Sequence, residues 1–131
     1  MKRLFQLSAF SFLVLASCST LDPNADPVVV NAEKTIKLSF HAVDAFLTFE
    51  KNNADLIKRT APDAHAYAEY VRRNARNWFR SATALTDAYR TSRTAENKAN
   101  LQTALQVLQV AQSEALRYTA AATTSTPAPS P

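Results

Sequence analysis

Apolar side chains recur every three or four residues through most of this chain, and this spacing predicts helices. Three segments carry the pattern, over residues 28–59, 62–90 and 95–119. Pro62 suits the first turn of the second helix, and Thr94 is a good N-cap for the third. The connections between the segments are short, so successive helices should be antiparallel. We therefore predict an all-α fold, an antiparallel three-helix bundle of the coiled-coil type.

Each predicted helix has one apolar seam. The first seam contains Ile36, Phe40, Val43, Leu47, Glu50, Ala54 and Ile57. The second contains Tyr67, Val71, Asn74, Trp78, Ala82, Leu85 and Tyr89. The third contains Asn97, Leu101, Ala104, Leu108, Ala111, Ala115 and Tyr118. Folding the chain at its two connections aligns the seams, so that Phe40 should meet Leu101, and Ile57 should meet Tyr67 and Tyr118.

One level of this predicted core is polar, because the same register brings together Glu50, Asn74 and Gln112. Such a layer more often fixes the register of a bundle than forms a reactive site. The pair Asn52-Asn53 is the weakest point of the first helix, where we expect a kink or fraying.

Composition removes several function classes. The 131 residues include no glycine, which excludes Gly-rich phosphate loops and dinucleotide fingerprints. A single cysteine excludes a disulfide framework and a Cys-cluster zinc site. His41 and His65 should lie at distant levels of the bundle with no carboxylate set around them. We predict no metal site, no cofactor and no catalytic residues, so that an enzyme is the weakest of the function classes.

The N-terminus has the features of an export signal. Two of the first three residues, Lys2 and Arg3, are basic. The segment 4–16 that follows is mostly apolar, but it is too short to span a bilayer. The apolar stretch ends in Leu15, Ala16, Ser17 and Cys18. This sequence resembles the lipobox of bacterial lipoprotein precursors, which implies cleavage before Cys18 and acylation of that cysteine. An ordinary cleaved signal peptide and an uncleaved anchor with an incidental cysteine are the alternatives.

The resemblance implies a membrane protein held by lipid. More than one acyl chain, such as palmitate, would hold the chain firmly, whereas one chain binds reversibly. Ser19 follows the cysteine, and in the lipoprotein family this favours the outer membrane, here with the domain facing the periplasm. We divide the chain into a signal peptide (1–17), a lipidated N-terminus and linker (18–27), the bundle (28–119), and a disordered Pro/Ser/Thr tail (120–131).

Arginines gather on the second helix and at the turn that follows it. They are Arg72, Arg73, Arg76, Arg80, Arg90 and Arg93. The arginine fork suits carboxylate and phosphate, so these residues are candidates for binding an anionic partner such as lipid headgroups. The alternative is a solvated helix face. Loss of the two basic residues of the signal lowers the formal net charge from +4 to +2, which does not indicate nucleic acid.

A second apolar stripe on the first helix includes Leu38, Phe49 and Leu56. It is either more core or a strip for a protein partner or self-association. These features together predict a small envelope lipoprotein with a helical binding or structural module. The alternative is a component of an envelope-spanning or lysis complex of the phage type.

Overall fold

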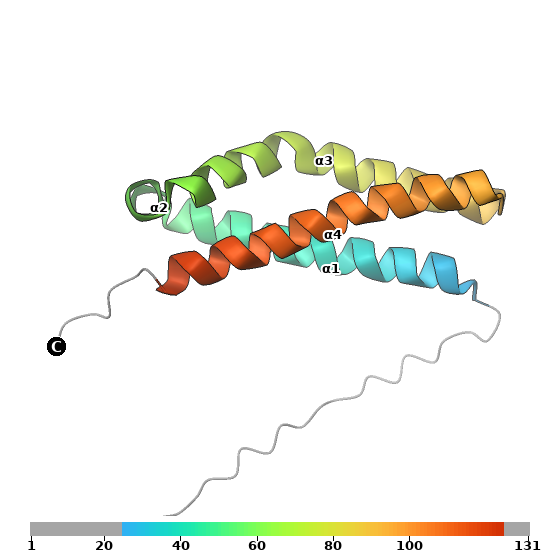
Figure 1. Ribbon diagram of the computed structural model, residues 1–131, viewed down its shortest axis with the longest axis horizontal. Coiled ribbons are helices and arrows are strands. Elements are labelled where there is room, and N and C mark those ends of the chain that lie inside the picture. The colour runs from blue at the N-terminus through green and yellow to red at the C-terminus, as the bar shows by residue number, and fades with distance from the viewer. Residues whose placement is uncertain (1–24, 125–131) are drawn as a thin grey trace, which may run out of the picture.

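The computed structural model describes residues 25–124, which form helices joined by short connections (Figure 1). The helices are α1 (Pro27–Asn52), α2 (Ala54–Thr60), α3 (Pro62–Thr91) and α4 (Ala95–Thr124). The predicted all-α class is confirmed for this range. None of these helices combines the length and hydropathy that a membrane-spanning segment needs.

The helix starts follow from local capping. The Asp26 carboxylate accepts the backbone N–H of Val28 at 2.8 Å, and a proline occupies the first turn of α1. Pro62 is the first residue of α3, as predicted. The Thr94 hydroxyl accepts the backbone N–H of Asn97 at 3.1 Å, which confirms its role as the cap of α4.

The end of α4 differs from the prediction. We placed residues 120–124 in the tail, but they continue the helix to Thr124. Three consecutive alanines start this last stretch, and alanine is the strongest helix former. One of them, Ala122, is buried.

Asn53 divides the first predicted helix in two, at the weak point identified from the sequence. Its backbone N–H donates to the carbonyls of Phe49 and Glu50, and its side chain donates to the Phe49 carbonyl at 2.8 Å. After Asn53 the chain changes direction, so that α2 leaves the axis of α1 and packs on α3 (Figure 1). Burial of Ile57, which is 2% exposed, holds α2 in place. A continuous helix over residues 28–59 is therefore wrong beyond Asn52.

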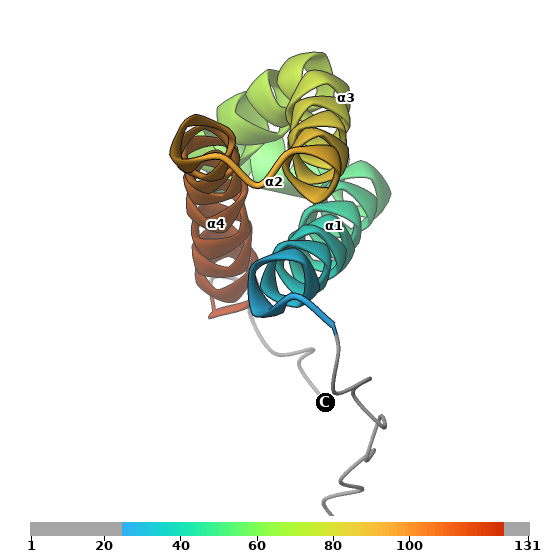
Figure 2. The same cartoon turned by 90° about the vertical axis from the view of Figure 1, so that its right-hand side faces the viewer.

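The three long helices lie side by side, with α3 running opposite to α1 and α4 (Figures 1 and 2). The start of α1 is at the same end as the connection between α3 and α4. An ion pair of 3.2 Å between Asp26 and Arg93 joins these two parts of the chain. The end of α4 lies at the opposite end of the domain (Figure 1).

The core consists of two clusters along the axis. The larger contains Val43, Phe46, Ala68, Val71, Ala111 and Ala115. The smaller contains Val29, Ala32, Tyr89 and Leu101. On α1 the buried ring is Phe46, at 1% exposure, whereas Phe40, predicted in the seam, is 52% exposed.

The register of α1 against α4 differs from the prediction by about three turns. Val29 and Ala32 pack with Leu101, where we expected Phe40. Phe46 stacks on Tyr118 with ring centroids 6.3 Å apart, where we expected Ile57. The predicted register assumed a continuous first helix folded back at residues 60–61, but the break at Asn53 removes α2 from that alignment. The predicted pairing of α3 with α4 is correct, since Tyr67 stacks on Tyr118 at 5.1 Å.

Candidate binding groove between α3 and α4

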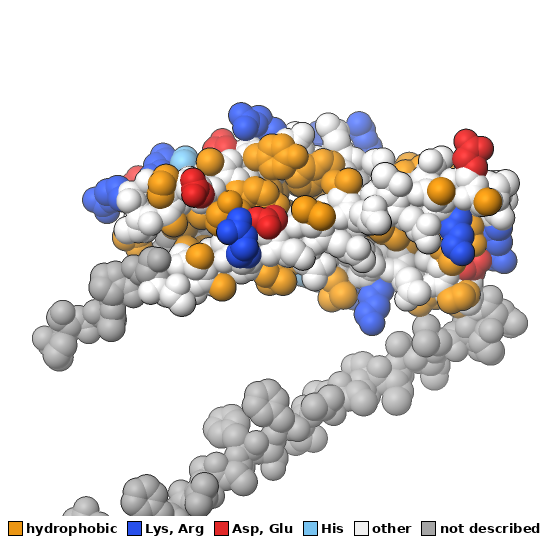
Figure 3. Space-filling view, viewed as in Figure 1, with side chains coloured by type: hydrophobic (Ala, Val, Ile, Leu, Met, Phe, Trp, Pro, Cys, Tyr) orange, Lys and Arg blue, Asp and Glu red, His pale blue; other side chains and the backbone are white. Residues whose placement is uncertain are grey.

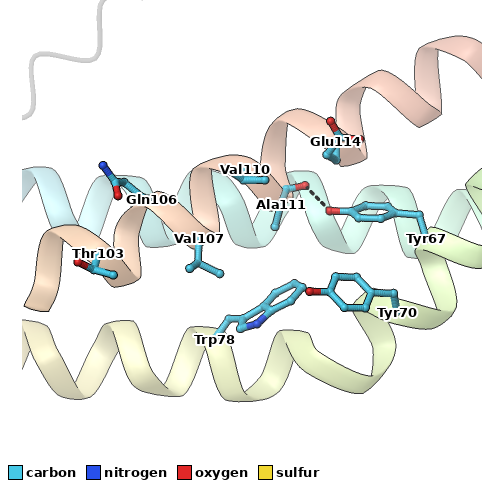
Figure 4. A pocket seen from close by; sticks show the side chains of 9 residues that line it. All are labelled: Tyr67, Tyr70, Trp78, Thr103, Gln106, Val107, Val110, Ala111 and Glu114. Atoms are coloured by element: carbon cyan, nitrogen blue, oxygen red, sulfur yellow. Dashed lines mark hydrogen bonds between the residues drawn. The ribbon is translucent and has the colours of Figure 1, made fainter.

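An open groove of about 320 Å³ lies between α3 and α4 (Figure 4). From α3 it is lined by Tyr67, Tyr70 and Trp78. From α4 it is lined by Thr103, Gln106, Val107, Val110, Ala111 and Glu114. Figure 3 shows apolar side chains gathered on the middle of this face. The volume is at the lower end of the range of about 300–1,000 Å³ that small-ligand sites occupy.

Residue size explains why the groove is open. The buried positions of the two helices at this level are small, including Ala68 on α3 and Ala111 and Ala115 on α4. These small side chains fill little of the space between the two helices, and the large rings of Tyr67 and Trp78 pack against them while staying partly exposed. Tyr70 is 47% exposed and Val110 is 64% exposed, so this edge is an apolar surface open to solvent.

The aromatic rings form a continuous row. Tyr67 stacks on Tyr118, and its ring centroid is 6.1 Å from that of Tyr70. Tyr70 in turn lies 5.4 Å from Trp78 at an angle of 55°. Because Tyr67 is fixed against the core ring of Phe46 at 5.7 Å, the row has a rigid base.

The polar groups of the groove include hydrogen-bond donors. The Tyr67 hydroxyl donates to the Ala111 carbonyl at 3.4 Å. Burial, with a smaller contribution from the nearby Glu114 carboxylate, raises the pKa of Tyr67 to about 12, so this hydroxyl stays neutral. The Tyr70 hydroxyl and the Trp78 indole N–H make no hydrogen bond to any residue of the described range. Both remain available to a ligand that offers acceptors.

A second cluster of polar residues lies where α1 ends. Glu50 is 1% exposed and accepts a hydrogen bond of 2.5 Å from Nδ1 of His65. It also forms an ion pair with Arg72, which pairs with Glu69 at 2.5 Å as well. His65 therefore has a carboxylate partner, contrary to our expectation.

These contacts determine the charge of Glu50. Burial alone would raise the pKa of Glu50, but the hydrogen bonds from Arg72 and His65 outweigh it and lower the pKa below its ordinary value. The carboxylate is held in its ionised form by neighbours that satisfy it. We assign this cluster to the joint between α1, α2 and α3 rather than to a reaction.

The predicted polar layer of Glu50, Asn74 and Gln112 does not form. The Asn74 side chain donates to the carbonyl of Tyr70 on its own helix at 2.8 Å. Gln112 accepts a hydrogen bond of 3.0 Å from the hydroxyl of Ser39. The shifted register of α1 is the reason, because it places Ser39 rather than Glu50 opposite Gln112.

The six candidate arginines divide into two groups of three. Arg72 pairs with Glu50 and Glu69, and Arg93 pairs with Asp26. Arg90 contacts the carboxylates of Glu33 and Asp87. The other three are exposed on α3 and form no ion pair with any described residue, namely Arg73, Arg76 and Arg80.

The predicted apolar strip on α1 is only partly at the surface. Leu38 is 50% exposed, whereas Phe49 and Leu56 are partly buried. Phe40 is also exposed on α1, and its ring makes an edge-to-face contact with Phe79 of α3 at 5.6 Å. The lipidation candidate Cys18, with Leu15, Ala16 and Ser17, lies outside the described residues.

Part of the groove was missed from the sequence. We assigned Tyr67 and Trp78 to the core seam, and did not single out Tyr70, Val107 or Val110. The available signal was two valines spaced three residues apart outside the seam of the third helix. In the described range, no group of three His, Cys, Asp or Glu residues has the placement needed to hold a metal ion.

Comparison with known proteins identifies no relative. No protein-family model matches the chain, and no curated protein or solved structure is significantly similar to it.

Proposed function

We propose that this chain is a lipid-anchored envelope protein whose helical domain binds a partner at the groove between α3 and α4. The observation that carries the binding function is the open row of Tyr67, Tyr70 and Trp78, which includes two unused hydrogen-bond donors. The lipid anchor rests on the lipobox-like sequence ending in Cys18, the only cysteine of the chain.

In this proposal α1, α3 and α4 act as an antiparallel, coiled-coil-like three-helix bundle that displays the groove. A helix of 30 residues is about 45 Å long, so the bundle is a rod with the groove on its side. The start of α1 is the end nearest to Cys18 in the sequence, which puts the connection of α3 and α4 toward the membrane. Ser19 favours the outer membrane, with the rod extending into the periplasm.

The proposal includes no catalytic step. Glu50, the buried carboxylate of the described range, is engaged by Arg72 and His65 and does not line the groove. An aromatic surface with neutral donors favours recognition of a ligand over reaction with it.

A second candidate function is a part of an envelope-spanning or lysis complex. One observation favours it. The described chain begins at one end of the rod and ends at the other, so a lipid at the first end would leave the second free to join a distant partner (Figure 1).

Site-specific photo-crosslinking in cells tests the binding function. A photoreactive amino acid is introduced at Val110 in the groove or, as the control, at Leu116, which is similarly exposed on α4 and does not line the groove. We expect a discrete crosslinked product from position 110 that is weakened by Trp78→Ala. Products of the same pattern and yield from both positions would contradict the assignment of the groove.

The anchor is tested separately, by the intact mass of protein extracted from membranes. We expect acyl additions on Cys18 and no residues before it. The Cys18→Ser variant should leave the membrane fraction, because it lacks the acyl chains that would hold the mature chain at the bilayer. A mature N-terminus elsewhere, or a Cys18→Ser variant that stays with the membrane, would refute lipidation.

A further inference from the structure

We propose that the groove between α3 and α4 binds an amphipathic helix of another protein, and that this helix carries acidic side chains on the flank that faces α3. The inference rests on the proposed binding function, because it names the partner of that same site. Three features of the groove support it, namely its length, the spacing of its side chains and its charge.

The groove follows α3 and α4 for about three helical turns. Trp78 and Val107 line both the main space and a smaller one of about 250 Å³, so the two spaces are continuous. From Thr103 to Glu114, α4 advances about 17 Å along the groove. A helix docked over that length presents three or four anchor side chains on one face, which is a recurring way for a groove to bind a helix.

The side chains that line the groove on α4 have the spacing of a helix-packing seam. Four of them follow one another at intervals of four, three and four residues, namely Thr103, Val107, Val110 and Glu114. The buried seam of the same helix is separate and includes Leu108 and Ala115. Valine is a weak helix former, and Val107 and Val110 are 41% and 64% exposed, so these two residues do little for α4 itself. A second seam of this kind favours a further helix as the neighbour.

The α3 edge of the groove is basic. Arg73 lies about one helical turn beyond Tyr70, and Arg80 donates a hydrogen bond of 3.4 Å to Asn77, which lines the smaller space. Neither arginine forms an ion pair with a described residue. Figure 3 shows basic side chains on the α3 side of the apolar surface. This uncompensated positive charge favours a partner with carboxylates on the corresponding flank.

The other polar groups of the groove suit the same partner. Glu114 on the α4 edge pairs with Arg117 at 2.5 Å, so it does not cancel the charge of the arginines on α3. The Tyr70 hydroxyl and the Trp78 indole N–H make no hydrogen bond to a described residue, and carboxylates accept such donors. A second copy of this chain fits less well, because it would bring the same unpaired arginines to the interface. Where no partner is bound, these arginines are free to meet lipid headgroups.

Trp78 is the only tryptophan of the chain, so its fluorescence reports directly on the groove. The mature chain with Cys18→Ser is titrated with two synthetic helical peptides that contain no tryptophan. Both peptides present leucines along one face, but one has glutamates on its flanks and the other has lysines. We expect the glutamate peptide to shift the Trp78 emission to shorter wavelength in a saturable way. The lysine peptide should bind about tenfold more weakly, because it forms no ion pairs with the two arginines.

Paired variants assign this preference to the edge of the groove. Arg73→Ser with Arg80→Ser should remove most of the preference for the glutamate peptide. Lys34→Ser with Lys37→Ser makes the same change in net charge at exposed positions of α1, and it should retain the preference. Circular dichroism checks that both double variants keep their helices.

Three results of the titration would overturn the acidic helix as the partner. The first is the absence of a saturable shift with the glutamate peptide. The second is an equal affinity for the two peptides, which would leave the arginines to the anionic membrane. The third is an equal loss of preference in both double variants, which would assign the effect to net charge rather than to the groove.

Crosslinking from position 110 in cells separates this inference from the binding function. A product that depends on Trp78 but not on Arg73 and Arg80 would keep the binding function and reject the acidic partner. A product that joins two copies of this chain would replace the partner with a second copy. Binding of the glutamate peptide without any crosslinked product would reject the binding function in cells and leave the chemistry of the groove intact.

Discussion

Glu50 shows how one residue can be charged and buried at once. Its carboxylate is 1% exposed, yet Arg72 and His65 both reach it from α3. The two partners are only partly buried, at 35% and 28% exposure of their side chains, so their own contact with water is retained. The cost of burying this ion therefore falls mainly on the carboxylate, and its partners offset that cost.

The lowered pKa of Glu50 predicts an acid-dependent contribution to stability. The folded-state pKa lies below the ordinary value of 4.5, so the folded protein holds the proton less well than the unfolded chain. The contribution is complete above 4.5 and is lost as the pH falls through the folded-state pKa. Wild type should exceed Glu50→Gln in free energy of unfolding near neutral pH, and the difference should shrink on acidification. Urea unfolding at a series of pH values measures it, and a difference independent of pH would contradict this assignment.

A double-mutant cycle separates the ion pair from the packing around it. Arg72→Ala leaves a buried carboxylate without its charged partner, so we expect a loss of about 1–3 kcal/mol in the free energy of unfolding. Glu50→Leu replaces the ion by an apolar side chain and should keep or raise stability. The double variant should recover most of the loss. Arg73→Ala, at a neighbouring position with no ion pair to a described residue, is the control and should change little.

If Arg73→Ala costs as much as Arg72→Ala, the effect belongs to the surface charge of α3 and the pair with Glu50 contributes nothing of its own. If Glu50→Leu unfolds the protein, the carboxylate is needed for the fold itself rather than only for the joint between α1 and α3.

At the scale of whole helices, the sequence was sufficient for the starts of α3 and α4 and for their alignment, but not for the end of α4 or for α1. Pro62 and Thr94 are local signals that fix where helices begin, and the short connection after Thr91 fixes how α3 and α4 align. The first helix also has local start signals, Asp26 and Pro27, but nothing local fixes which of its faces is buried, because both Phe40 and Phe46 fit an apolar spacing of three and four. Which of the two rings is buried depends on whether the helix continues past Asn53. The break at Asn53 depends in turn on the tertiary burial of Ile57 on α3.

The groove was harder to predict for a related reason. An aromatic side chain at a seam position can be buried by the neighbouring helix or left partly exposed, and the seam pattern in the sequence is the same in both cases. The outcome is set by the size of the residue across the interface, which is alanine at position 111. The spacing therefore found Tyr67 and Trp78 but not the open face that they share.

Two phenylalanines on α1 test the observed face of this helix directly. Phe46→Ala should cost about 3–5 kcal/mol in the free energy of unfolding, because it empties the centre of the larger core cluster. Phe40→Ala removes a side chain that is 52% exposed and should cost well under half as much. Denaturant unfolding of both variants gives the comparison. The reverse order would restore the face predicted from the sequence.

At the scale of the molecule, ion pairs neutralise some of the arginines and leave others with an uncompensated positive charge. Arg90 and Arg93 lie at the end of the rod nearest the start of α1, where a lipid anchor would place them close to headgroups. Both are engaged by carboxylates, however, and so contribute little net charge there. The exposed side of α3 differs, since its arginines at positions 73, 76 and 80 form no ion pair with a described residue.

This distribution predicts which arginines contact an anionic membrane. On anionic vesicles, the mature chain with Cys18→Ser should bind more weakly when Arg73, Arg76 and Arg80 are all replaced by serine. At about 1 kcal/mol for each basic residue near the surface, the loss is somewhat more than about 100-fold at low salt and fades as salt is added. Arg90→Ser with Arg93→Ser should have the smaller effect, because carboxylates already neutralise these two residues. A larger loss from that pair would instead make the connection between α3 and α4 the membrane contact, and would mean that its ion pairs open at the lipid surface.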